Sequence, residues 1–226
     1  MTDLASLTWP EVARRTADGP LLLAVPVGAT EQHGPHLPLS TDTDIAVALA
    51  ERLARRRTGV VVSPPVAFGS SGEHQGFAGT LSIGQEAVEL LLVELVRSAS
   101  ASFPRIVLVS AHGGNAGPVS RAVRRLRDEQ RDVLAWSPRW GGDAHAGRTE
   151  TSVMLALSPD RVRLERAEAG NTTPVAQLMP ALRDGGLKPV TANGVLGDPT
   201  GAAAEEGHAL LLHATEDLVA FLSDRR

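Results

Sequence analysis

Histidine and carboxylate side chains recur together along this sequence, and these residue types support two kinds of chemistry. They ligate metals such as Zn²⁺, Fe²⁺ and Mn²⁺, and they transfer protons as general acids and bases. The residues concerned are Glu31, His33, His36, Asp42, Glu73, His74, His112, His145 and Glu150. The two other histidines, His208 and His213, are five residues apart on a predicted helix, so we expect them to be surface or packing residues.

The stretch Glu31-Gln32-His33 is expected to be extended, which places Glu31 and His33 on the same side of the backbone. Asp42 follows after a loop bent by glycine and proline. Because a carboxylate has two oxygens, Asp42 can bridge two metal ions about 3.5–4 Å apart. The alternative interpretation is that Asp42 is the N-cap of the next helix and Glu31 a solvated loop residue.

Two further stretches carry the same residue types. His112 opens a His-Gly-Gly-Asn stretch directly after a predicted strand, where the glycines permit a close backbone approach to a ligand. The alternatives are a structural histidine in a turn, or a phosphate loop, although the nucleotide-binding glycine patterns are missing. His145 precedes a predicted helix and Glu150 lies in its first turn, an arrangement suited to acid–base catalysis. Glu150 can instead be a metal ligand or a partner of the helix dipole.

The remaining candidates have weaker signals. Glu73 and His74 lie in a glycine-rich loop that is expected to be a mobile substrate lid or a plain surface loop. His36 is expected to orient a metal ligand from behind. Arg148 can grip a substrate carboxylate or be a solvated charge at a helix start.

Short aliphatic runs alternate with amphipathic stretches, which predicts a largely parallel sheet with helices on both faces. The predicted strands cover residues 21–27, 59–66, 105–110 and 132–136. The predicted helices cover residues 42–57, 85–102, 118–131, 149–157 and 205–223. In such an open α/β sheet the loops at the carboxyl ends of the strands meet at one edge, where ligands bind. The candidate residues therefore converge, within one domain spanning residues 1–226.

Composition excludes several classes of protein. The chain has 226 residues, no cysteine and a formal net charge of −4, so disulfides, thiolate metal sites and general nucleic-acid binding are not expected. No apolar run reaches the length of a transmembrane helix, about 18 residues or more. We expect a cytoplasmic protein without membrane contact.

Three segments resemble the hallmark motifs of the creatininase family of metal-dependent amidohydrolases. They are PVGATEQHGPHLPLSTD, SAHGGNAG and DAHAGRTETS, within roughly residues 20 to 160. The resemblance implies a three-layer α/β/α domain, two divalent metal ions, hydrolysis of a C–N amide bond and a homo-oligomer, often a hexamer. It also implies that Glu31, Asp42 and His112 hold one ion and that His33 and Asp42 hold the other. His145 and Glu150 match the catalytic pair.

One position departs from the family pattern. Creatininase has a glutamate ligand two residues after the histidine of the third-strand loop, where this chain has Gly114. The second metal is then short of one ligand unless Glu150 or water supplies it, which argues against creatinine as the substrate.

Two segments together, SSGEHQGFAGTLSIG and WGGDAHAGRTETS, are most similar to a subgroup that trims a modified ribosomal precursor peptide near its C-terminus. A deformylase acting on a formamidopyrimidine is the alternative within the family. A doubly wound module that binds a metal or small ligand without turnover is the alternative outside enzymes.

Overall fold

The computed structural model describes residues 3–224 and contains a parallel sheet with the strand order β2-β1-β3-β4. The strands are β1 (Leu22–Val27), β2 (Val60–Val62), β3 (Arg105–Ser110) and β4 (Asp132–Trp136). They are almost continuously aliphatic because helices cover both faces of the sheet. The predicted parallel α/β architecture is confirmed.

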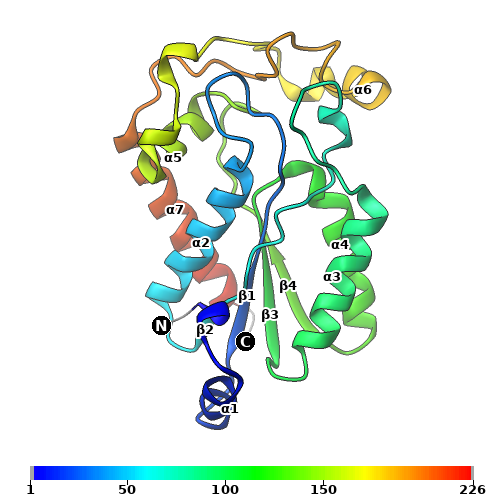
Figure 1. Ribbon diagram of the computed structural model, residues 1–226, viewed down its shortest axis with the longest axis vertical. Coiled ribbons are helices and arrows are strands. Elements are labelled where there is room, and N and C mark those ends of the chain that lie inside the picture. The colour runs from blue at the N-terminus through cyan, green and yellow to red at the C-terminus, as the bar shows by residue number, and fades with distance from the viewer. Residues whose placement is uncertain (1–2, 225–226) are drawn as a thin grey trace.

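Two layers of helices enclose the sheet (Figure 1). One face is covered by α2 (Thr41–Arg56), α5 (Arg148–Leu157) and α7 (Ala204–Ser223). The other is covered by α3 (Gln85–Ala99) and α4 (Ala116–Asp128). Alternate strand residues feed two separate cores, with Val107 in the first and Ile106 in the second. This three-layer sandwich holds the strand ends, and the loops that follow them, in a fixed arrangement.

The structure departs from the predicted elements in three places. The strand predicted over residues 59–66 ends at Val62, because the prolines at 64 and 65 cannot donate to the sheet. Two helices were not predicted: α1 (Trp9–Ala17) and α6 (Val175–Gly185). Neither contains a buried residue, so both lie at the surface rather than in the core.

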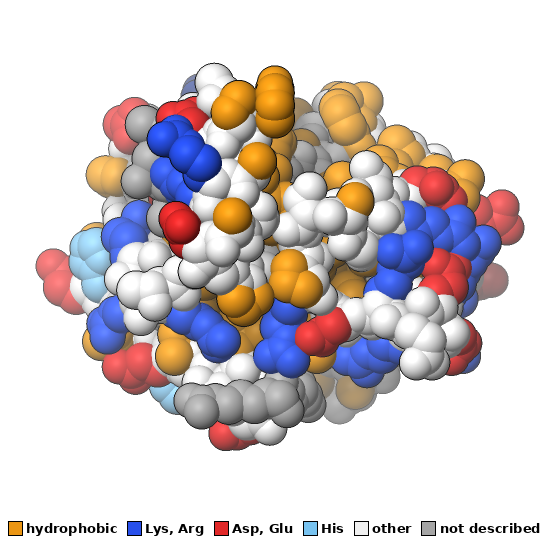
Figure 2. Space-filling model, turned by 90° about the horizontal axis from the view of Figure 1, so that it is seen from below, with side chains coloured by type: hydrophobic (Ala, Val, Ile, Leu, Met, Phe, Trp, Pro, Cys, Tyr) orange, Lys and Arg blue, Asp and Glu red, His pale blue; other side chains and the backbone are white. Residues whose placement is uncertain are grey.

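The two ends of the sheet differ in character. Long loops gather beyond the carboxyl ends of the strands, at the top of Figure 1, together with α6. The opposite end, seen in Figure 2, has basic and acidic side chains interspersed rather than grouped by sign. Within residues 3–224 no helix is both long and apolar enough to cross a membrane.

Candidate metal centre

The loops at the carboxyl ends of the strands bring a set of titratable side chains into the interior. Those that are buried are Glu31, His33, Asp42, His74, His112 and His145. Glu150, in the first turn of α5, lies beside them with its side chain 13% exposed. Ser40 is the N-cap of α2, so the interpretation of Asp42 as that cap is wrong, and Asp42 faces the cluster instead.

Asp42 lies between two imidazoles. Its Oδ1 is 3.2 Å from His33 Nε2, and its Oδ2 is 3.2 Å from His112 Nδ1. Glu31 Oε1 is 3.3 Å from the same His112 nitrogen. One carboxylate therefore serves both sides of the cluster, as a bridging ligand does.

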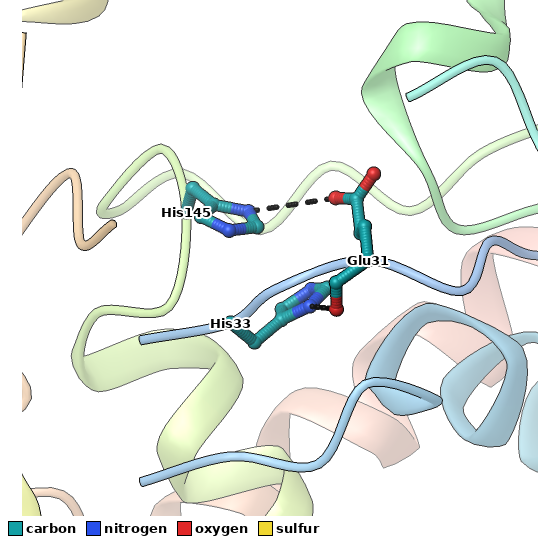
Figure 3. A group of neighbouring side chains, drawn as sticks. All are labelled: Glu31, His33 and His145. Carbon is teal, nitrogen blue, oxygen red and sulfur yellow. Dashed lines mark hydrogen bonds and ion pairs between the residues drawn. The ribbon is translucent and has the colours of Figure 1, made fainter. Parts of the chain in front are cut away.

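Three groups in the described part of the chain have ligand atoms within 4.8 Å of one another. They are Glu31–Asp42–His112, His33–Asp42–Glu150 and Glu31–His33–His145. Figure 3 shows the last group, with His145 pointing at Glu31 from a different segment of the chain. The first two groups share Asp42. The second group includes Glu150, which can supply the ligand that the second metal lacks when Gly114 takes the place of a glutamate.

Three of the histidines direct one ring nitrogen at a backbone carbonyl oxygen. The pairs are His33 Nδ1 with Glu31 at 3.1 Å, His112 Nε2 with Ser70 at 2.9 Å, and His145 Nε2 with Gln32 at 2.9 Å. A carbonyl oxygen only accepts hydrogen bonds, so these nitrogens are the ones that donate. The other nitrogen of each ring faces the carboxylates, which is the arrangement that orients histidine ligands around metals.

The carboxylates have buried oxygens without a well-formed hydrogen bond. Both Oε atoms of Glu31 and Oδ2 of Asp42 make no hydrogen bond of regular geometry with residues 3–224, although imidazole nitrogens lie 3.2–3.3 Å from Glu31 Oε1 and Asp42 Oδ2. A buried anionic oxygen without a well-formed hydrogen bond is costly. A divalent cation would satisfy these oxygens together with the imidazole nitrogens, so the residues present fit the metals that the sequence predicts.

The electrostatics of the cluster also favour a bound cation. Burial opposes the charged form of His33, but Asp42, Glu150 and Glu31 together outweigh it and raise the pKa of His33 to about 10. Burial likewise opposes charge on His112, yet Asp42 and Glu31 raise its pKa above the ordinary value. The metal-free carboxylates thus hold protons on two imidazoles, and a metal ion would supply that positive charge in their place.

The pKa shifts of His145 and Glu150 favour the neutral form of each side chain, in contrast to those of His33 and His112. Burial, reinforced by His33 and His74, lowers the pKa of His145 well below its ordinary value. Burial raises the pKa of Glu150 to about 7. Glu150 Oε2 accepts a hydrogen bond of 2.6 Å from the Ala146 N–H and lies 3.9 Å from His33 Nε2.

Comparison with known proteins identifies the family. The family model of creatininase, described as creatinine amidohydrolase, matches residues 5–222. The chain belongs to the creatininase family.

Several curated relatives are identical to the chain at about half of the aligned positions. A mycofactocin precursor peptide peptidase from Mycobacterium ulcerans is 48% identical over 222 residues, covering 94% of this chain and 84% of the relative. One from Mycolicibacterium smegmatis is 54% identical over 196 residues, covering 84% and 79%. Among solved structures, a Zn-Zn type creatininase variant has a TM-score of 0.85 at 27% identity and covers 99% of this chain and 97% of its own. A manganese form of creatininase has a TM-score of 0.84 at 27% identity, with coverage of 99% and 98%.

The space beside Gly114 is filled by another loop. A Cβ built on Gly114 would lie 2.3 Å from the Ser70 carbonyl oxygen and 2.5 Å from Glu73 Oε1. The loop around residues 70–74 therefore excludes a side chain at position 114.

His74 is the buried residue that sequence analysis missed as part of the centre. The 3-10 turn Gly72–His74 places its Nε2 3.2 Å from Glu31 Oε1, so the expectation of a mobile lid or surface loop is wrong for this side chain. The available signal was its position in a loop after a strand, as for the other histidines of the cluster.

Other candidates lie outside the cluster. His36 is buried with its Nε2 2.8 Å from Thr151 Oγ1. Arg148 is half exposed and pairs with Glu206 Oε2 at 2.8 Å, which favours the solvated interpretation. His208 and His213 are exposed on α7, as predicted.

Proposed function

We propose that this protein is a metal-dependent peptidase that hydrolyses an amide bond near the C-terminus of a modified ribosomal precursor peptide in mycofactocin biosynthesis. The family and the relatives named mycofactocin precursor peptide peptidase support the substrate. The observation from the site that supports hydrolysis is Asp42, whose two oxygens face different histidines and serve two ligand groups at once.

The proposed ligands follow these two groups. Glu31, Asp42 and His112 would hold one ion, and His33, Asp42 and Glu150 the other. Mixed imidazole and carboxylate ligands suit Zn²⁺, Fe²⁺ and Mn²⁺. When bound, the ions supply an acidified water and polarise the scissile carbonyl.

His145 is the proposed proton carrier. Its Nε2 donates to the Gln32 carbonyl oxygen, which leaves Nδ1 free and directed at the cluster. Its lowered pKa favours a neutral ring that accepts a proton at Nδ1 and passes it on to the leaving nitrogen. Glu150 is proposed to act beside it, either as a ligand or as a second proton acceptor.

A neighbouring hollow offers room for a peptide chain. A cavity of about 480 Å³ is lined by Phe68, Gln75, Thr80, Leu81, Ser82 and Ile83. It adjoins the site through Thr80, whose Oγ1 accepts a hydrogen bond of 3.1 Å from the Gln32 N–H. We propose that this hollow receives the peptide next to the scissile bond.

The substrate is tested by incubating metal-loaded protein separately with the modified precursor peptide, creatinine and a formamidopyrimidine nucleotide. Mass spectrometry should show one internal amide of the peptide hydrolysed close to its C-terminus and no turnover of creatinine. An intact peptide alongside turnover of a small molecule would reject the peptidase assignment. Binding of metal without any turnover would favour the binding-module alternative.

The site is tested with a matched pair of aspartates on α2. Asp42→Asn should lose most of the bound metal, because the bridging carboxylate serves both groups. Asp44→Asn is the control, since Asp44 pairs with Arg161 and Ser40 outside the cluster and should keep its metal. A full metal complement in Asp42→Asn would exclude the bridge.

His145 has its own control. His145→Asn should retain metal and lose turnover by about 10²–10⁴-fold, the usual contribution of general acid–base catalysis. The exposed His213→Asn should retain both. Loss of metal in His145→Asn would make His145 a ligand instead.

Two expectations from the sequence stay predictions. Light scattering on the purified protein tests for a homo-oligomer, including the hexamer that the family resemblance implies. Fractionation of the producing cell tests the cytoplasmic location.

A further inference from the structure

Gln32 lies between two of the proposed metal ligands, and its side chain is held at both ends. Its Oε1 accepts a hydrogen bond of 2.9 Å from the Gly34 N–H, and its Nε2 donates one of 3.0 Å to the Gly194 carbonyl oxygen. An oxygen must face the N–H and a nitrogen must face the carbonyl. These two contacts therefore fix which way the amide points.

The orientation of the Gln32 amide determines which ring nitrogen of His74 carries the hydrogen. Gln32 Nε2 lies 3.0 Å from His74 Nδ1. Because an amide nitrogen only donates, His74 Nδ1 must accept, and the ring hydrogen is on Nε2. That Nε2 is the nitrogen 3.2 Å from Glu31 Oε1. His145 Nε2 lies 3.1 Å from the same amide nitrogen, but it donates to the Gln32 carbonyl oxygen and does not compete as an acceptor.

We propose that Gln32 and His74 are a pair of positioning residues that orient the Glu31 carboxylate, with Gln32 setting the tautomer of His74 and the protonated Nε2 of His74 lying 3.2 Å from Glu31 Oε1 as an electrostatic contact. His74 is then not a metal ligand, although it lies as close to Glu31 as His112 does. This inference rests on the proposed metal centre, in which Glu31 is a ligand.

Gly194 provides independent support for this arrangement. A Cβ on Gly194 would lie 1.9 Å from Gln32 Oε1, and the backbone there has a φ of +83°. Both features require glycine, so the loop around residue 194 approaches the Gln32 amide as closely as a backbone can. Gln32 is 5% exposed and His74 is 4% exposed, which keeps water from replacing either partner.

The proposal matters because the position of a ligating carboxylate depends on its hydrogen-bond partners. Removing such an outer partner typically weakens metal affinity by about 10- to 100-fold. A purely space-filling Gln32 would instead tolerate an apolar side chain of the same length.

The tautomer is measured directly by ¹⁵N NMR of the histidine-labelled, metal-free full-length protein, with His74→Asn identifying the His74 signals. We expect an unprotonated Nδ1 and a protonated Nε2. Gln32→Glu keeps the size of the side chain but places an acceptor opposite Nδ1, so the proton should move to that nitrogen. A protonated Nδ1 in the wild-type protein would overturn the proposal.

The consequence for the centre is measured by competition between the protein and a chelator for Zn²⁺. Gln32→Met should weaken zinc affinity by about 10- to 100-fold. The control is Gln177→Met, the same substitution at an exposed glutamine on α6, which should leave affinity unchanged.

Equal zinc affinities in Gln32→Met and Gln177→Met would refute the positioning role. Circular dichroism establishes that each variant folds, and Gln32→Glu replaces Gln32→Met if the latter does not. Neither measurement uses a peptide, so failure of the proposed peptidase activity is distinguishable from failure of this inference.

Discussion

Adjacent glycines after His112 provide a matched test of how the centre is built. An added Cβ at Gly113 would meet nothing within 4 Å among the described residues, whereas at Gly114 it would lie 2.3 Å from the Ser70 carbonyl oxygen. Gly113→Ala and Gly114→Ala add the same methyl group one residue apart. We expect Gly113→Ala to leave stability and zinc affinity unchanged. We expect Gly114→Ala to lower both.

The size of the effect follows from the contacts at Gly114. Real Cβ atoms essentially never show contacts shorter than 3.0 Å, so Ser70 O must retreat by at least 0.7 Å, the difference between 3.0 and 2.3 Å. The same oxygen accepts the 2.9 Å hydrogen bond from His112 Nε2, and that nitrogen is itself 2.5 Å from the added carbon. Overpacking of this kind costs about 1–3 kcal/mol. Losing the bond that orients a histidine ligand weakens metal affinity by about 10- to 100-fold.

Urea denaturation and zinc competition measure the two effects separately. Gly114→Ala should unfold at lower urea and bind zinc more weakly than Gly113→Ala. Gly114→Glu, which restores the glutamate of creatininase, should be worse still, because the loop around residues 70–74 already fills that space. Zinc affinity in Gly114→Ala equal to that of Gly113→Ala would show that the close packing of this loop does not position His112.

Four further predictions concern helix packing, a surface ion pair and stabilisation by metal. Gly207→Ala should destabilise the protein by about 1–3 kcal/mol in urea denaturation, because the added Cβ would lie 1.9 Å from Ser152 O, where α7 crosses α5. Gly117→Ala adds a Cβ that lies near flexible side-chain ends only, so it should leave the free energy of unfolding unchanged or raise it by up to about 1 kcal/mol. Arg148→Ala should leave peptide cleavage unchanged and cost at most about 1 kcal/mol, since its partner Glu206 lies at the surface. Zinc at 100 times its dissociation constant should stabilise the fold by about 2.7 kcal/mol and raise the Tm in calorimetry, and a chelator should reverse the shift.

The strands and core helices were predictable because their burial leaves a periodic signal. The strand β3 matches its prediction at both ends, since Arg105–Ser110 is a single aliphatic run between two polar turns. The helix α6 was missed although Val175, Leu178, Met179 and Leu182 recur at helical spacing, because Pro180 inside it lowers its helix propensity and none of its residues is buried.

The part of the candidate site that could be predicted is the set of residues in the loops that follow the strands. Glu31, Asp42, His112 and His145 each lie beside the carboxyl edge of the sheet, and the parallel topology alone brings those loops together. Which carboxylate oxygen faces which imidazole depends on side-chain geometry that no periodicity records. Glu150 illustrates this, because its place beside His33 depends on the turn at Ala146 that precedes α5.

Gln32 shows where inference from sequence stops and why. On an extended backbone, alternate residues point to opposite sides, so a residue between Glu31 and His33 is directed away from the face that those two share. No role was predicted for Gln32, because this alternation says only that its side chain lies on the other side of the segment. Its partners, however, are 42 residues away at His74 and 162 residues away at Gly194. Only the folded loops show that one amide joins both to the segment that carries the proposed ligands.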